Sequence, residues 1–130
     1  MNKTLLNTEI QEFITNHLNS NIHQLILKGS PFEGLDIKEL IAQIEAKKKC
    51  ALKLKTWFET PGIYYPHKLN IEQTSSETAA RIKSEFMQGE SIVDLTGGFG
   101  VDSYYFSKQF KSVVHCEVNP ELAEITAYNF

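Results

Sequence analysis

The stretch that decides the fold is Ser91–Phe110, SIVDLTGGFGVDSYYFSKQF. Its opening Ile92–Leu95 is mostly apolar and β-branched, which predicts a short strand buried on both faces. From Val101 the apolar residues return at helical spacing, and between strand and helix stands the glycine-rich Thr96–Gly100. Glycine is typical of places where the backbone takes a positive φ or where another group approaches closely. A strand, a glycine turn and a helix start together expose backbone N–H groups. The stretch therefore predicts a pocket for a nucleotide-like or carboxylate-bearing ligand.

The neighbouring segments continue an α/β pattern. Upstream, the sequence TSSE at 74–77 has the form of a capping box and predicts a helix from about Thr74, ended near Gly89. Downstream, Ser112–Glu117 (SVVHCE) predicts a second strand, and Asn119-Pro120 predicts the start of another helix, because proline is favoured in the first helical turn. The order helix, strand, helix, strand, helix is that of the first half of a Rossmann-like parallel sheet with right-handed crossovers.

The preceding half of the chain has a different character. Apolar residues at helical spacing predict helices over Leu5–Leu18 and Ile22–Lys28, and a longer one capped by Asp36 and running toward Trp57. Thr60–Asn70 is expected to be a turn-rich connector. We therefore expect an α/β protein with a helical N-terminal subdomain at 1–70 and the start of a Rossmann-like domain at 71–130.

Composition excludes several classes of protein. The chain has 130 residues, a formal net charge of −3 and 42% hydrophobic residues, which is typical of a globular domain. No apolar run approaches the roughly 20 residues that span a bilayer, and Met1–Phe13 lacks the apolar core of a secretory signal. We expect a cytoplasmic protein without a membrane partner, in which Cys50 and Cys116 are reduced. The spacing of histidines and cysteines predicts no metal site.

Two classes of ligand use a glycine turn of this kind. A dinucleotide needs the pattern G-x-G-x-x-G, and the nearest match here, Gly98–Ser103, has serine in place of the third glycine. S-adenosyl-L-methionine (SAM) carries no phosphate. It needs a bare glycine backbone under its methionine part, an acceptor near its ammonium group and a carboxylate at the end of the next strand for its ribose hydroxyls.

The residues Asp94–Gly100, DLTGGFG, resemble motif I of class I SAM-dependent methyltransferases, with the pattern D/E-x-G-x-G-x-G. Thr96 replaces the first glycine, as is common in the RNA- and DNA-modifying branches. Glu117 matches the ribose-binding acid of the family, and Leu69–Thr74 (LNIEQT) looks like a segment that precedes the first strand in several nucleic-acid methyltransferases. Together with its helical preface, the region 71–130 is most similar to bacterial methyltransferases with a THUMP-like RNA-binding region further along the chain.

The resemblance implies a SAM site. Asp94 would accept a hydrogen bond from the ammonium group, and Glu117 would bind both ribose hydroxyls. Thr74 as a helix cap, Asp94 as an Asx turn and Glu117 as an ordinary strand-end carboxylate stay open as alternatives. Asp102 is interpreted as a residue that compensates the helix dipole rather than as a ligand contact. The implied cofactor-binding residues are Gln73, Thr74, Asp94, Thr96, Gly97, Gly98, Gly100 and Glu117.

The implied activity is methyl transfer from SAM to a base of RNA. The catalytic loop is expected beyond Phe130, so no catalytic residue is named, and the chain is expected to be an N-terminal fragment that is inactive alone. It would otherwise complete its sheet by self-association or with another chain. Two alternatives stay open. One is an NAD-binding oxidoreductase domain, and the other is a non-catalytic helical RNA-binding module that uses the five lysines within Lys47–Lys55.

Overall fold

The computed structural model describes all residues from Met1 to Phe130. They form two compact units, Met1–Lys68 and Leu69–Phe130. The sequence-based boundary, after residue 70, lies close to this division. No helix, including the 17-residue α3 (Ile37–Lys53), combines the length and the apolar character that a membrane crossing requires.

The first unit is helical. A 3₁₀ turn at Lys3–Leu6 precedes α1 (Thr8–Asn16), so the single helix expected over 5–18 is broken near Asn7. The remaining helices are α2 (Ile22–Lys28), α3 and α4 (Lys55–Glu59). Asp36 caps α3 as predicted, since its carboxylate accepts a hydrogen bond from the backbone N–H of Lys38 at 2.9 Å.

The connector after α4 is packed rather than loose. Its Tyr65 is 2% exposed, and the Gln43 side chain both donates to the Tyr65 carbonyl (2.7 Å) and accepts from the Tyr65 N–H (3.0 Å). The end of the connector is helical, because α5 occupies Lys68–Gln73. The prediction of a turn-rich segment up to Asn70 is therefore wrong for its last residues.

The second unit contains α6 (Glu77–Phe86), β1 (Ser91–Asp94), α7 (Val101–Phe106), β2 (Ser112–His115) and α8 (Pro120–Asn129). The predicted helix start at Thr74 is wrong by three residues. The Thr74 N–H still donates to the Asn70 carbonyl at the end of α5, whereas the Ser76 hydroxyl accepts from the N–H of Ala79 and caps α6. At α8 the prediction is confirmed, because Asn119 caps the helix and Pro120 is its first residue.

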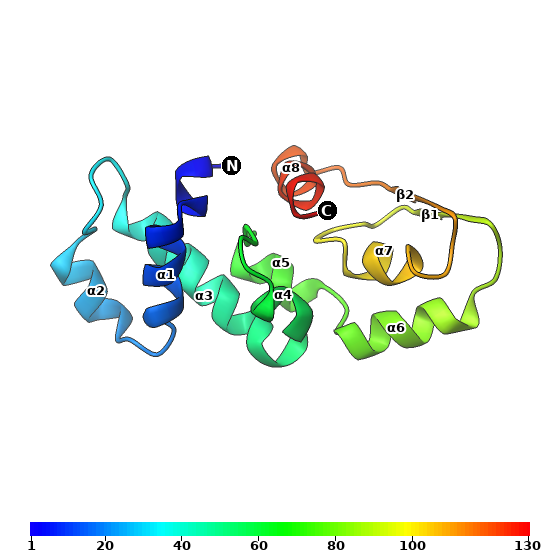
Figure 1. Ribbon diagram of the computed structural model, residues 1–130, viewed down its shortest axis with the longest axis horizontal. Helices are drawn as coiled ribbons and strands as arrows, with labels where there is room; N and C mark the ends of the chain where they lie inside the picture. The colour runs from blue at the N-terminus through cyan, green and yellow to red at the C-terminus, as the bar shows by residue number, and fades with distance from the viewer. The chain divides into compact units, whose positions relative to one another are not determined.

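The two strands pair in parallel, with Ser91 opposite Ser112 and Asp94 opposite His115. Helix α7 packs against both strands and lies between them and α6 (Figure 1). The opposite face of the sheet is bare, with Val93 55% and Val114 51% exposed. The expectation that β1 is buried on both faces is therefore wrong for this chain, because the two-stranded sheet has a helical cover on one side.

Candidate cofactor site

A pocket of about 570 Å³ opens where the two parallel strands end. This is the edge of an α/β sheet at which ligands ordinarily bind, and the volume is within the usual range for a small-molecule site. The wall combines the end of α5, one lysine of α6, the glycine loop after β1 and the loop after β2. Its lining residues are Asn70, Gln73, Thr74, Ser75, Lys83, Thr96, Gly97, Gly98, Phe99, Asp102, Glu117, Asn119 and Leu122.

The glycine loop is held by hydrogen bonds that continue the sheet beyond its last strand residues. The N–H of Cys116 donates to the carbonyl of Asp94 (2.8 Å), and the N–H of Gly97 donates to the carbonyl of Cys116 (2.9 Å). The Gly98 carbonyl accepts from the Thr126 hydroxyl at 2.9 Å and lies 3.2 Å from Nε2 of His115. The loop is therefore fixed by the protein itself.

The three glycines of this loop are required for different reasons. Gly98 has a φ of +53°, and a Cβ placed there would meet no side chain, so this position on the pocket wall stays open to a ligand. A Cβ on Gly97 would collide with the His115 ring. At Gly100, where φ is +83°, a Cβ would lie 2.7 Å from Phe130 and 2.8 Å from Thr126. Gly100 thus accommodates the protein's own helix α8 and does not line the pocket.

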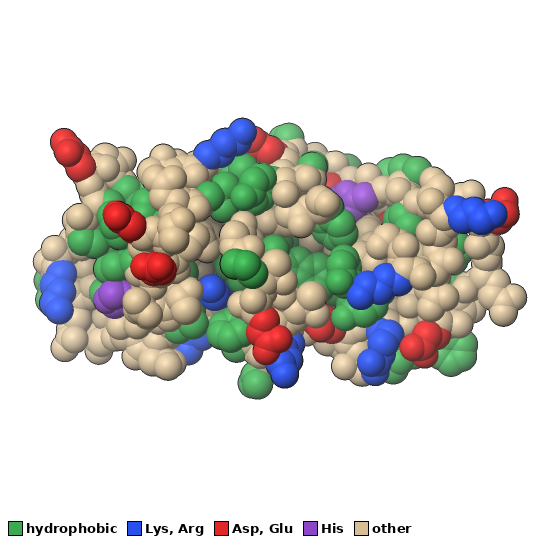
Figure 2. All heavy atoms as spheres, in the orientation of Figure 1, with side chains coloured by type: hydrophobic (Ala, Val, Ile, Leu, Met, Phe, Trp, Pro, Cys, Tyr) green, Lys and Arg blue, Asp and Glu red, His purple; other side chains and the backbone are tan.

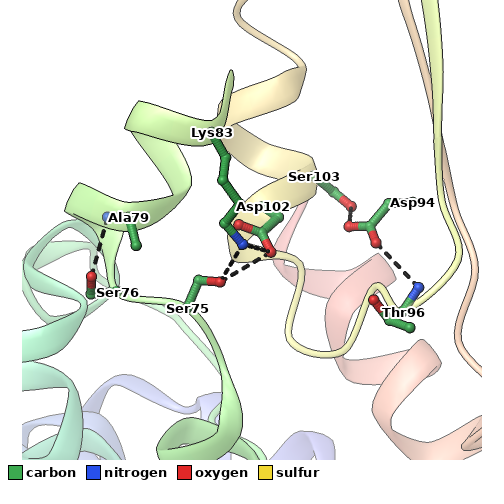
Figure 3. Close-up of polar contacts among 8 residues, drawn as sticks. All are labelled: Ser75, Ser76, Ala79, Lys83, Asp94, Thr96, Asp102 and Ser103. Atoms are coloured by element: carbon green, nitrogen blue, oxygen red, sulfur yellow. Dashed lines mark hydrogen bonds and ion pairs between the residues drawn. The ribbon is translucent and has the colours of Figure 1, made fainter. Parts of the chain in front are cut away.

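Asp94 also lies outside the pocket lining. It is buried, and its two oxygens accept hydrogen bonds from the N–H of Thr96 (3.2 Å) and from the hydroxyl of Ser103 (2.7 Å) (Figure 3). The bond to Thr96, two residues on, is the Asx-turn arrangement. This carboxylate therefore ties the glycine loop to α7, and its role as an ammonium acceptor stays a prediction.

Glu117 joins the two loops that form the pocket. One carboxylate oxygen accepts from the N–H of Gly98 (2.9 Å), and the other accepts from the N–H of Asn119 (2.8 Å). A carboxylate offers about four acceptor sites, so two are left for a ligand. The residue lies on the pocket wall.

Three further polar side chains on the wall form a cluster that we call the polar triad, Lys83, Ser75 and Asp102. The Lys83 ammonium lies 2.7 Å from Oδ2 of Asp102 and donates to the Ser75 hydroxyl at 2.7 Å. That hydroxyl donates to the same Asp102 oxygen at 3.1 Å (Figure 3). The other oxygen, Oδ1, is enclosed and has no hydrogen-bond partner.

The sequence reasoning missed Lys83 and Ser75 and assigned Asp102 a role within its helix. Gln73 and Thr74, by contrast, line the pocket from the end of α5. Among the lining residues, one ammonium and two carboxylates carry charge, so the wall has a formal net charge of −1. No group of three or more His, Cys, Asp or Glu side chains is placed to hold a metal ion.

The five lysines within Lys47–Lys55 are not all exposed. Lys47 is 8% exposed, donates to the Thr15 hydroxyl at 2.9 Å and lies over the Phe58 ring, and its burial lowers its pKa. Lys55 lies 3.6 Å from Glu59. On the face drawn in Figure 2, positive and negative side chains are interspersed. Lys47 is therefore not part of an exposed basic surface, and the helical RNA-binding module stays a prediction.

Comparison with known proteins gives one informative match. No protein-family model matches this sequence, and no curated protein does. Among solved structures, the chain is similar to the crystal structure of a "putative methyltransferase" from Porphyromonas gingivalis W83, with a TM-score of 0.81 and 25% sequence identity. The match covers 99% of this chain and 32% of that chain, so this chain spans about a third of the length of its structural neighbour. The likeness supports the partial Rossmann-like fold expected for the second half of the chain.

Proposed function

We propose that this chain binds SAM in the pocket at the ends of β1 and β2 and forms part of a methyltransferase that acts on RNA. The observation that carries the proposal is the bond between Glu117 and the N–H of Gly98. It brings the acid after β2 and the bare glycine after β1 to one pocket wall. A carboxylate after the second strand is where a ribose is bound in this kind of sheet. The structural likeness to a protein described as a methyltransferase supports the same class of activity.

The charge of the wall favours SAM over a dinucleotide. SAM carries a sulfonium, an ammonium and a carboxylate, so it has one more positive than negative charge. The lining groups have a net charge of −1, which complements this cofactor and opposes the pyrophosphate of NAD. The lining contains no arginine, although arginine is the residue that holds phosphate groups best.

Different residues of the pocket wall contact different parts of the cofactor in this proposal. Glu117 accepts from the ribose hydroxyls with its two spare acceptor sites. Gly98 lies against the ligand without a side chain, and Gln73 and Thr74 border it from the end of α5. The bound cofactor supplies the methyl group on its sulfonium. RNA as the acceptor rests on the sequence resemblance of 71–130 to bacterial methyltransferases with a THUMP-like RNA-binding region; Thr96 within DLTGGFG is shared by RNA- and DNA-modifying branches.

Titration calorimetry on the 130-residue chain tests the binding proposal with SAM, S-adenosylhomocysteine (SAH) and NAD. We expect SAM and SAH to bind and NAD to give no heat. Glu117→Gln should weaken SAH at least about tenfold, the loss typical of one hydrogen bond to a charged group. The matched control is Glu90→Gln, because Glu90 is a carboxylate of the same unit, 79% exposed and paired with Lys111 on the surface. Tight NAD binding without any response to SAH would overturn the proposal.

Transfer is a separate question from binding. Methyl transfer depends chiefly on positioning both reactants, and this chain spans about a third of its structural neighbour. We therefore expect the chain to bind SAM without methylating RNA. The measurement is incorporation of a labelled methyl group into total bacterial RNA. Transfer by this chain at an appreciable rate would contradict the expectation that the catalytic residues lie elsewhere.

A further inference from the structure

A second charged part of the pocket wall is separate from Glu117. It is the polar triad of Lys83, Ser75 and Asp102, contributed by α6, the loop before α6, and α7. We propose that the triad recognises the amino-acid end of the bound ligand, with Asp102 accepting from its ammonium group and Lys83 donating to its carboxylate. This inference rests on the proposed function and assigns the orientation of the ligand within the same pocket.

The hydrogen-bonding capacity of the triad is only partly used. An ammonium group has three donors, and Lys83 uses two of them, one to Ser75 and one to Asp102. Asp102 receives both of its bonds on Oδ2, while Oδ1 has none. Asp102 lines the pocket, and the terminal torsion of an aspartate is soft, so we expect the carboxylate to rotate on ligand binding and present Oδ1 to a donor there. One donor and one acceptor are thus left for a zwitterion.

The triad differs from an ordinary surface ion pair. Lys111 and Glu90, also in this unit, pair at 2.6 Å with both side chains 79% exposed, and such pairs contribute little to stability. Asp102 is 27% exposed, and its unpaired oxygen is enclosed, which costs stability unless a donor arrives. A ligand ammonium would supply that donor. Ser75 bonds to both the Lys83 ammonium and the Asp102 carboxylate, and these opposite charges complement the carboxylate and ammonium groups of an α-amino acid.

The test uses two ligands that differ only in this end. SAH carries the amino-acid group, whereas 5′-methylthioadenosine keeps the adenosine and the sulfur but lacks it. By calorimetry on the full chain, Asp102→Asn should weaken SAH about tenfold or more and leave methylthioadenosine within about twofold. Lys83→Met, at a side chain that is 44% exposed, keeps the apolar stem and should show the same selectivity. Glu117→Gln should weaken both ligands, and the matched control Lys111→Met neither.

The outcomes separate the two proposals. If neither ligand binds the unsubstituted chain, the proposed function fails and this inference with it. If both ligands bind and the Asp102 and Lys83 variants weaken them equally, or leave SAH unchanged, the inference alone is overturned. Circular dichroism of each variant checks that it folds. Should Asp102→Asn unfold the unit, the more exposed Lys83→Met decides the matter.

Discussion

Replacing Ser103 with alanine should destabilise the second unit while leaving its ligand pocket intact. The Ser103 hydroxyl donates to Oδ2 of Asp94 at 2.7 Å, and the two residues are 5% and 9% exposed. The substitution removes a hydrogen bond to a charged group and leaves a buried carboxylate oxygen without a donor. We expect a loss of about 1.5–3 kcal/mol in the free energy of unfolding. The corresponding opening equilibrium increases by roughly 10- to 150-fold.

The assay must report on this unit specifically. Trp57, the one tryptophan, lies in the other unit, so its fluorescence does not report the change. Hydrogen exchange followed by mass spectrometry on peptides that contain β1 and α7 does, because exchange measures local opening. The matched control is Ser107→Ala, an exposed serine at the end of the same helix whose hydroxyl donates to the Tyr104 carbonyl. Its effect should stay within about 0.5 kcal/mol.

Binding measurements complete this prediction. Neither Ser103 nor Asp94 lines the cofactor pocket, so Ser103→Ala should leave the affinity of the folded protein for SAH within about twofold. Unchanged exchange in β1 and α7 would refute the structural role that we assign to this bond. An Asp94→Asn variant that folds with wild-type exchange but no longer binds SAH would support Asp94 as a direct ligand contact.

Three further predictions concern other parts of the chain. Gly98→Ala should cost about 1–2 kcal/mol through backbone strain alone. Gly100→Ala should cost more, because its Cβ also meets buried Thr126 of α8 at 2.8 Å. Hydrogen exchange compares the two variants, and equal costs would contradict the packing role of Gly100. Burial lowers the folded-state pKa of Lys47, so the folded state loses this proton before the unfolded state does, and Lys47 should contribute a gain in stability as pH increases toward 10.5. Burial raises the pKa of Tyr65, which contributes a loss of stability at the alkaline end of this range. In urea denaturation followed by Trp57 fluorescence, Lys47→Met should therefore lose stability relative to the unsubstituted chain as the pH is raised toward 10.5. The bare face of the sheet predicts self-association, which Val93→Lys should reduce in sedimentation equilibrium; a strictly monomeric unsubstituted chain would contradict this.

The sequence predicted best what depends on neighbouring residues. Asp36 and Asn119 cap their helices as expected, because a cap is a local hydrogen bond to a backbone two or three residues away. The capping box at 74–77 failed for an equally local reason. Three consecutive hydroxyl side chains can each cap a helix, and the pattern does not say which one will. In the structure Ser76 does so, while Thr74 completes the hydrogen bonding of α5.

Contacts between residues that are far apart in the sequence could not be predicted from the sequence motif. In DLTGGFG, Asp94 and Gly100 match the motif as well as Gly98 does, but Asp94 bonds to α7 and Gly100 gives room to Phe130. A motif records that a glycine is needed and does not record whether a ligand or the protein's own side chain needs it. Lys83 lies 19 residues before Asp102, and only the packing of α6 on α7 reveals their pairing.

Glu117 holds two loops together and, in our proposal, also binds the ribose, so the effect of its substitution can have two causes. Its oxygens accept from the N–H groups of Gly98 and Asn119. A glutamine has a single acceptor oxygen, so Glu117→Gln loosens one loop as well as removing charge. A ligand that lacks a ribose hydroxyl separates the two effects, because a thermodynamic cycle isolates the direct interaction. If Glu117 binds the sugar, 2′-deoxy-SAH should bind the unsubstituted chain several-fold more weakly than SAH, and the variant should not distinguish them. Equal discrimination by both proteins would mean that Glu117 only shapes the loop.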